Sequence, residues 1–180
     1  LDFFYKMWPE SIQPDVRNIV GIADRILAAY VRGQLLLGLV VGVVTFIGLY
    51  FIGVEYAIPL AVLAGIFEMI PILGPWLSGV AAVIVVLATD PGKIWAVIIL
   101  FVVIQQVENT FLVPKIQGDA VDLNPAIIMI LLVVGGAVYG LLGVIIIVPA
   151  AAIVRDIFVY IYGRLSEEGN LETSDPEPSG

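Results

Sequence analysis

The chain has 180 residues, 61% of them hydrophobic and 13% charged, with a formal net charge of −8. A soluble domain is nearer half apolar and a quarter charged, so this composition predicts an all-α polytopic membrane protein. The sequence has no cysteine and no histidine, which excludes a disulfide framework, thiol catalysis, histidine metal sites and a Ser-His-Asp triad.

The first predicted element is an amphipathic helix that leads into a membrane span. Residues 1–13 begin without a methionine and are interpreted as the continuation of a longer protein. In residues 14–34, apolar side chains recur every three or four positions, which predicts a helix lying at the membrane surface. Pro14 suits its first turn. The helix is expected to continue into residues 35–53, which are long enough to cross a hydrocarbon core of about 30 Å.

Two shorter apolar pieces follow, at 56–73 and 76–89. The hinge between them is predicted at Pro71 and the Gly74-Pro75 pair. Interrupted apolar helices of this kind are typical of membrane transport sites.

Residues 93–113 form another full-length span, followed by a polar linker at 114–125. Two more apolar pieces are predicted at 126–138 and 140–161. The hinges expected in this second pair are Gly135, Gly136 and Pro149.

The C-terminal residues 166–180 combine acids with proline and serine, which predicts a disordered acidic tail. Residues 35–165 are assigned to a transmembrane transport domain. They carry too few basic side chains to form a nucleic-acid surface, so no nucleic-acid partner is expected.

A long span followed by a hinged pair occurs twice, which predicts an inverted repeat. The distribution of basic residues agrees with this topology, because cytoplasmic loops are enriched in lysine and arginine. With the N-terminal flank and the C-terminus in the cytoplasm, only Lys93 falls outside. The residues that fall inside are Lys6, Arg17, Arg25, Arg32, Lys115, Arg155 and Arg164. The count is the same whether a hinged pair crosses the bilayer or dips in and returns.

Glu68 lies in an apolar run that contains no other charge. A carboxylate at membrane depth costs several kcal/mol unless it is protonated, paired or exposed to a wet cavity. It is therefore a candidate coupling acid for protons or cations. The alternative is a structural acid that hydrogen-bonds a neighbouring helix.

A polar cluster interrupts the end of the span 93–113. Its members are predicted to share or adjoin one helical face, and they are Gln105, Gln106, Glu108 and Asn109. Such a cluster could contact a polar solute along a pathway. Equally, it could hydrogen-bond between helices, at roughly 1 kcal/mol per contact.

The glycines and prolines admit two interpretations each. At the two hinges, helix ends could present their dipoles to an ion or solute, or they could form simple turns. Gly38 and Gly42 form a small-xxx-small step, which predicts close helix packing.

Several motifs, in order along residues 10–165, resemble the autoinducer-2 exporter family, also called the PerM-like permeases. The matching segments are Tyr30-Val-Arg-Gly-Gln-Leu35, Glu68-Met-Ile-Pro-Ile-Leu-Gly-Pro75, Gln105-Gln-Val-Glu-Asn109, Leu112-Val-Pro-Lys-Ile-Gln-Gly118, Leu123-Asn-Pro125 and Val148-Pro149-Ala, with Gly135, Gly136 and Gly140 between the last two. The resemblance covers the C-terminal half of a family member.

The resemblance implies a transporter of the bacterial or archaeal inner membrane. Family members are associated with export of the signal autoinducer-2, and some with sodium(lithium)/proton antiport. Glu68 favours antiport, because a cation and a proton can compete for a carboxylate. The amides at 105–109 favour a sugar-like polar signal. Both alternatives stay open.

The combined prediction is secondary export of a small solute, coupled to an ion gradient, with Glu68 as coupling acid and residues 105–109 contacting the cargo. Neither catalysis, nor a metal site, nor a cofactor is expected, and the candidate coupling ions are Na⁺ and H⁺. The expected partners are the lipid bilayer, a small polar solute or monovalent cation, and further copies of the chain. The remaining alternative is a structural membrane protein that transports nothing.

Overall fold

A computed structural model describes residue 9 and residues 12–116 and 124–172, and within these ranges every regular element is a helix. The elements are α2 (Gln13–Ile52), α3 (Ala57–Phe67), α4 (Leu73–Thr89), a 3₁₀ turn (Pro91–Lys93), α5 (Ile94–Val107), a π-helical turn (Glu108–Leu112), α6 (Val113–Ile116) and α7 (Pro125–Glu172). The prediction of an all-α fold is confirmed. Residues 1–8, 10–11, 117–123 and 173–180 lie outside the described part, which leaves most of the predicted N-terminal segment, part of the linker and the end of the acidic tail without a structural account.

Helix α2 joins the predicted surface helix and the first span into one helix of 40 residues. Pro14 occupies its first turn, where a missing N–H is not needed for a helical hydrogen bond. The helix ends at Gly53, where φ is 78°. Glycine adopts this left-handed conformation at little steric cost because it has no Cβ, and the Gly53 N–H donates to the carbonyl of Tyr50. The continuity expected from the sequence is confirmed.

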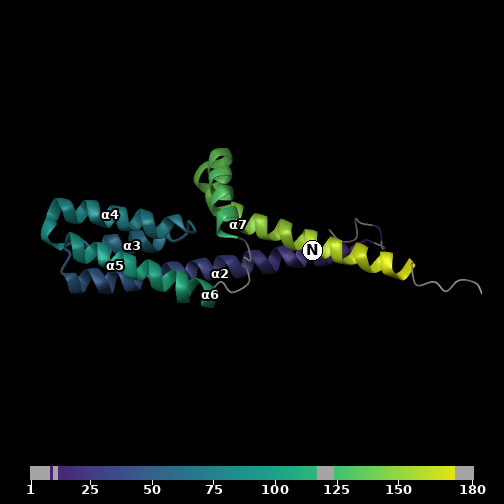
Figure 1. Cartoon of the computed structure of the whole chain (residues 1–180), viewed down its shortest axis with the longest axis horizontal. Coiled ribbons are helices and arrows are strands. Elements are labelled where there is room, and N and C mark those ends of the chain that lie inside the picture. The colour runs from purple at the N-terminus through teal and green to yellow at the C-terminus, as the bar shows by residue number, and fades with distance from the viewer. Residues whose placement is uncertain (1–8, 10–11, 117–123, 173–180) are drawn as a thin grey trace, which may run out of the picture.

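Helices α3 and α4 form a hairpin that lies beside α2 and α5 (Figure 1). At about 1.5 Å per residue, α3 is about 17 Å long and α4 about 26 Å, so each is shorter than a core of about 30 Å. The break spans residues 68–72, which include Pro71 but not Gly74 or Pro75, so the predicted hinge is corrected for those two residues. Gly74 and Pro75 belong instead to the first turn of α4. Proline is tolerated there for the same reason as at the start of α2.

Helices α2, α3, α4 and α5 share a core near the end that carries the α4–α5 turn. Its buried members are Leu49, Val54, Ala57, Leu60, Ala82, Val86 and Val97. Deeper in the bundle, α2 and α3 approach through glycines: a Cβ on Gly38 would lie 2.7 Å from the Gly65 carbonyl oxygen, and a Cβ on Gly42 would lie 3.3 Å from the Ala61 carbonyl oxygen. The close packing predicted for the Gly38-Gly42 step is confirmed.

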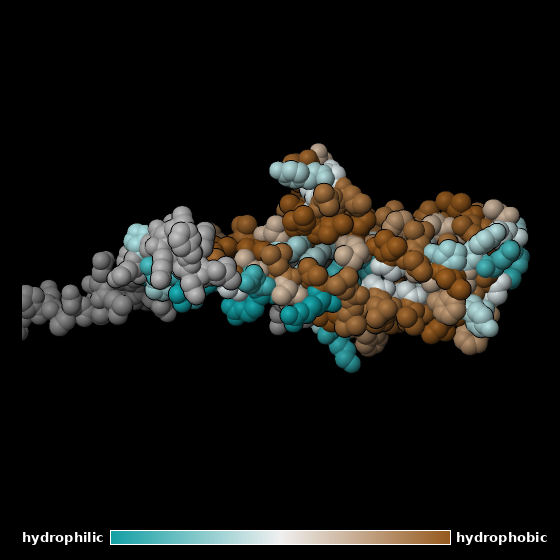
Figure 2. All heavy atoms as spheres, turned by 180° about the vertical axis from the view of Figure 1, so that it is seen from behind, coloured by the Kyte–Doolittle hydropathy of each residue, from teal (hydrophilic) through white to brown (hydrophobic). Residues whose placement is uncertain are grey.

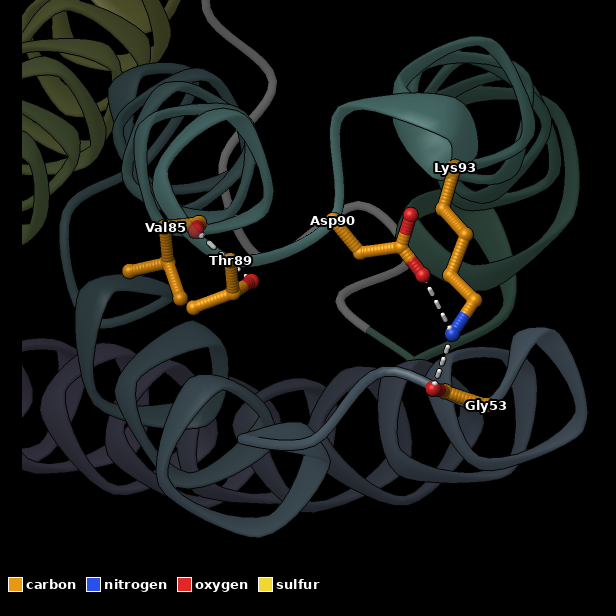
Figure 3. A network of polar contacts seen from close by, with 5 residues as sticks. All are labelled: Gly53, Val85, Thr89, Asp90 and Lys93. Carbon is orange, nitrogen blue, oxygen red and sulfur yellow. Dashed lines mark hydrogen bonds and ion pairs between the residues drawn. The ribbon is translucent and has the colours of Figure 1, made fainter.

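Lys93 fastens the α4–α5 turn to the end of α2 (Figure 3). Its Nζ donates to the Gly53 carbonyl at 2.7 Å and pairs with Asp90 Oδ2 at 2.9 Å. The hydrogen bond from Lys93 lowers the pKa of Asp90 from its ordinary value. Nearby, the Thr89 hydroxyl donates to the Val85 carbonyl at 3.0 Å.

Helix α7 contains a second hairpin, which points away from the four-helix bundle (Figure 1). The chain reverses at Gly140, where φ is 60° and ψ is −142°. A Cβ on Gly135 would lie 2.7 Å from the Gly143 carbonyl oxygen, so the two arms touch through their backbones. The predicted hinge at Gly135 and Gly136 is corrected to Gly140. Pro149 lies inside α7, which continues to Glu172 and so enters the segment predicted as a disordered tail.

The C-terminal half of α7 runs beside the N-terminal half of α2 (Figure 1). Tyr160 donates its hydroxyl proton to Asp15 Oδ1 at 2.8 Å and accepts from Asn18 Nδ2 at 2.9 Å. Arg164 pairs with the same carboxylate. These contacts join two segments that lie at opposite ends of the chain.

Three helical segments are long and apolar enough to cross a membrane, at Gln13–Ile52, Pro91–Ile116 and Ala126–Arg164. Apolar side chains cover most of the surface of the bundle formed by α2 to α5. Hydrophilic side chains gather at the end with the α4–α5 turn and where α2 and α7 extend beyond the bundle (Figure 2). The two hairpins each follow a long helix, as the sequence predicts. Their inverted relation stays a prediction.

Candidate functional site

The break between α3 and α4 carries Glu68, which is 2% exposed. Glu108, the residue that directly follows α5, reaches the same place and is 3% exposed. The two carboxyl groups meet. Within the described residues, neither Glu68 Oε2 nor Glu108 Oε2 has a hydrogen-bond donor. Buried oxygens of this kind are rare, and each one calls for a reason.

Gln34 links helix α2 to the segment that carries Glu68. Its amide, 1% exposed, donates from Nε2 to the backbone carbonyl of Glu68. This carbonyl lies at the helix break, where it would otherwise have no helical partner. Gln34 therefore anchors the break to α2. Sequence reasoning passed over this residue, although a lone glutamine at the start of an apolar span was the available signal.

The carboxyl pair lies deep in the bundle. Lys93 and Gly53 mark one end of the bundle, where they are hydrogen-bonded. Along the helix axes, Glu108 lies about 22 Å from Lys93, and Gln34 lies about 28 Å from Gly53. The carboxyl pair thus lies toward the end of the spans that is opposite the contact of Lys93 with Gly53 and Asp90.

A π-helical turn begins at Glu108. Such a turn inserts an extra residue into the helix and changes which side chains share a face, and it occurs often at functional sites. Glu108 points into the bundle, one turn beyond buried Ile104, while Gln105, Gln106 and Asn109 line a groove outside. The single polar face predicted for these residues is corrected: the structure divides it in two.

The backbone of the break contains one unusual residue. Ile72 has φ 67° and ψ −44°, and the Leu73 N–H reaches the Pro71 carbonyl at 2.7 Å, which closes a γ-turn. A β-branched residue with positive φ is a strained conformation. Gly74 follows directly, and a Cβ there would overlap the carbonyl of Phe67. The break is thus compact and held under local strain beside Glu68.

The groove lies between α4 and α5 and has a volume of about 510 Å³. Apolar side chains form most of its walls, and the three amides stand at the end nearest Pro75. Glu68 and Glu108 are absent from its lining. The candidate residues therefore occupy two neighbouring places, a buried carboxyl pair inside the bundle and an amide-bearing groove on its outside. The second set of predicted hinges lies apart from both, in α7.

These features define a class: a multi-pass helical membrane protein with a broken hairpin and a polar site at membrane depth, as transport proteins have. The model of the family described as "AI-2E family transporter" matches residues 1–163. The chain belongs to this family of membrane transporters, and the resemblance read from the motifs is confirmed.

Three relatives illustrate the similarity. The chain is 36% identical over 169 residues to "Putative transport protein YueF" of Bacillus subtilis (strain 168), which covers 93% of the chain and 46% of the relative. It is 31% identical over 162 residues to "Putative transport protein YrrI" of the same strain, covering 90% and 45%. It is 30% identical over 145 residues to "Putative permease PerM" of Escherichia coli (strain K12), covering 77% and 40%. The chain thus spans less than half the length of these relatives. No solved structure gives a significant match.

Proposed function

We propose that the chain forms part of an ion-coupled secondary transporter that exports a small solute, with Glu68 and Glu108 binding the coupling ion. The observation that carries this proposal is the meeting of two buried carboxyl groups at a helix break, each with an oxygen that lacks a donor. A solute of the autoinducer-2 type is the cargo that the family description suggests.

The physical argument starts from charge. Two carboxylates buried side by side cannot both remain ionised, because each charge loses hydration and the two repel. The pair therefore needs a proton or a monovalent cation. Such a group exchanges its ion only when water reaches it, so ion exchange requires the site to open and close.

The α3–α4 break is the element proposed to move. Its strained turn at Ile72 lies close to Glu68, and a hydrogen bond from Gln34 to the Glu68 carbonyl ties the break to α2. A change at the break would alter the approach of Glu68 to Glu108. Loss of the proton would favour separation of the two carboxyls, and this separation would open the path.

Gln105, Gln106 and Asn109 are proposed to contact the cargo. Gln105 and Gln106 lie at the end of α5, and Asn109 lies in the π-helical turn, next to Glu108 in the sequence. The groove is therefore on one side of this helical segment and the carboxyl pair on the other. Cargo binding and ion binding would thus act on the same π-helical turn.

Sodium(lithium)/proton antiport is the second candidate. The specific observation in its favour is that two carboxyl groups supply oxygen ligands, which Na⁺ and Li⁺ prefer and for which protons compete. Further proposals accompany both candidates: location in the inner membrane, cytoplasmic placement of the N-terminal flank and C-terminus, and assembly from several copies.

Flux into proteoliposomes of the complete protein tests the proposal. Sodium, lithium and autoinducer-2 are each measured with and without an imposed proton gradient. Gradient-dependent movement of autoinducer-2 supports coupled export, and gradient-dependent movement of only sodium or lithium supports antiport. Absence of flux for all three substrates under both conditions would contradict both and leave the structural alternative.

A further inference from the structure

The groove between α4 and α5 has two chemically distinct parts. Apolar side chains line it from Trp76 to Ile84 on α4 and from Ile98 to Val102 on α5. Its polar end consists of three amides, those of Gln105, Gln106 and Asn109. Within the described chain, no ionisable side chain lines it.

The amides need a partner that the bundle does not supply. No hydrogen bond to any of the three is found within the described residues. They belong to a segment long and apolar enough to span the membrane, where an unpaired amide facing hydrocarbon is costly. A hydrogen-bonding group on a bound molecule would satisfy them. That group would be uncharged, because an ion in this groove would have no opposite charge beside it.

The dimensions fit a molecule with an extended apolar part. The α4 wall from Pro75 to Ile84 is about 14 Å long. The volume of about 510 Å³ falls within the range of about 300–1,000 Å³ that small-molecule sites have. A sugar-like diol is polar on all sides, so it would use the amides and leave most of the wall unfilled. An amphipathic molecule would use both parts.

We propose that this groove binds an uncharged amphipathic solute, with its hydrogen-bonding head at the amides and its apolar body along α4 and α5. The inference rests on the proposed transport function and replaces the sugar-like cargo considered there with an uncharged amphipathic one.

Binding of a brominated decanamide to the complete protein in phosphatidylcholine nanodiscs tests this proposal. Bromine quenches tryptophan at short range, and Trp76 lines the groove. We expect saturable quenching that Trp76→Phe removes. The double variant Gln105→Ala/Asn109→Ala should bind about thirtyfold more weakly, since it loses two hydrogen bonds at about 1 kcal/mol each. Brominated decanoate should bind roughly tenfold more weakly or worse, because its carboxylate would be buried unpaired.

Two substitutions fill the groove and one serves as their control. Val80 and Ile84 line it and are 57% and 61% exposed, so Val80→Phe/Ile84→Phe adds bulk to the groove and leaves the core unchanged. This variant should lose most of the quenching. Leu87 is also on α4 and is 53% exposed, but it lies outside the groove lining, so Leu87→Phe should bind as the parent does.

Three results would overturn the proposal. Quenching unchanged by the amide substitutions would mean that a lipid-like chain merely partitions into the groove. Equal affinity for a brominated short diol would mean a wholly polar cargo. Cross-linking between copies through Val80→Cys would mean that a second copy covers the groove. The proposed function is tested by a different measurement, the dependence of proton-driven flux on Glu68. Failure of the groove proposal is therefore distinguishable from failure of the proposed function.

Discussion

At Ile72 the backbone adopts φ 67° and ψ −44° beside the buried carboxyl of Glu68. Residues held in such sparsely populated regions cost about 1–3 kcal/mol each and persist only where the surroundings enforce them. Here two features hold the conformation. The Leu73 N–H closes a γ-turn with the Pro71 carbonyl, and Gly74, which has no Cβ, packs directly against the Phe67 carbonyl. Strain stored next to the carboxyl that is proposed to bind the coupling ion is consistent with a break that changes shape.

Replacing Ile72 should reveal this strain through a reversed order of stability. In an ordinary loop, alanine is more stable than glycine by about 0.4–1 kcal/mol. At a positive φ the Cβ of alanine costs about 1–2 kcal/mol, so Ile72→Gly should unfold at a higher temperature than Ile72→Ala. Thermal unfolding of both variants in the same detergent measures the difference. The usual order, with alanine the more stable, would contradict a strained turn.

Asp90 gives a second prediction at this scale. Its pKa is lowered by the hydrogen bond from Lys93, so the pair contributes stability above the ordinary value of 3.8 and loses it as pH falls through the lowered pKa. The unfolding temperature of the parent should therefore exceed that of Asp90→Asn at neutral pH. The gap should close in strong acid. A gap that is the same at both pH values would show that Asp90 acts through packing alone.

At the scale of elements, the packing of α2 against α3 depends on glycines that let the two backbones touch. A Cβ on Gly65 would lie 2.8 Å from the Gly38 carbonyl oxygen, and neither backbone can yield without moving its helix. This contact holds the α3–α4 hairpin in the depth where Gln34 and Glu68 meet.

Gly65→Ala should destabilise the protein by about 1–3 kcal/mol, as overpacking does in close-packed interiors. Gly21→Ala is the matched control, because Gly21 is also helical but nothing lies within 4 Å of its added Cβ. That change should stabilise by about 0.5–1 kcal/mol through reduced backbone freedom of the unfolded chain. Chemical unfolding of both variants measures the contrast, and similar effects at the two positions would refute the close-contact account.

Much of this element order follows from the sequence, because hydrophobic periodicity and the length of apolar runs are strong signals. Glu68 was also found from sequence, since a lone acid in an apolar run is costly. The position of the breaks was not, because Pro75 fits equally well in a hinge or in the first turn of a helix. Glu108 points inward at regular helical spacing from buried Val97 and Ile104, but α5 is apolar on every side, so the sequence does not show which of its faces is the inner one. Gln34 required the three-dimensional contact to the Glu68 carbonyl.

At the scale of the whole molecule, the chain is a helical bundle with a hairpin of α7 that points away from it. It spans less than half of its relatives' length, and many large apolar side chains remain exposed on the bundle. Lipid, further helices and other copies of the chain are the partners proposed for this surface. Among the described residues, the buried side chains of Gln34, Glu68 and Glu108 come together at the α3–α4 break, and the proposed coupling depends on that contact.

The most direct measurement of this coupling is proton-driven flux in proteoliposomes for Glu68→Gln, Glu108→Gln and the double variant. Both residues act on one ion, so each single variant should lose coupling by roughly tenfold or more, and the double variant should be no worse than the weaker single. Glu55→Gln, at an exposed position after α2, is the matched control and should retain full coupling. Full coupling in both single variants, or losses that multiply in the double, would contradict a shared site.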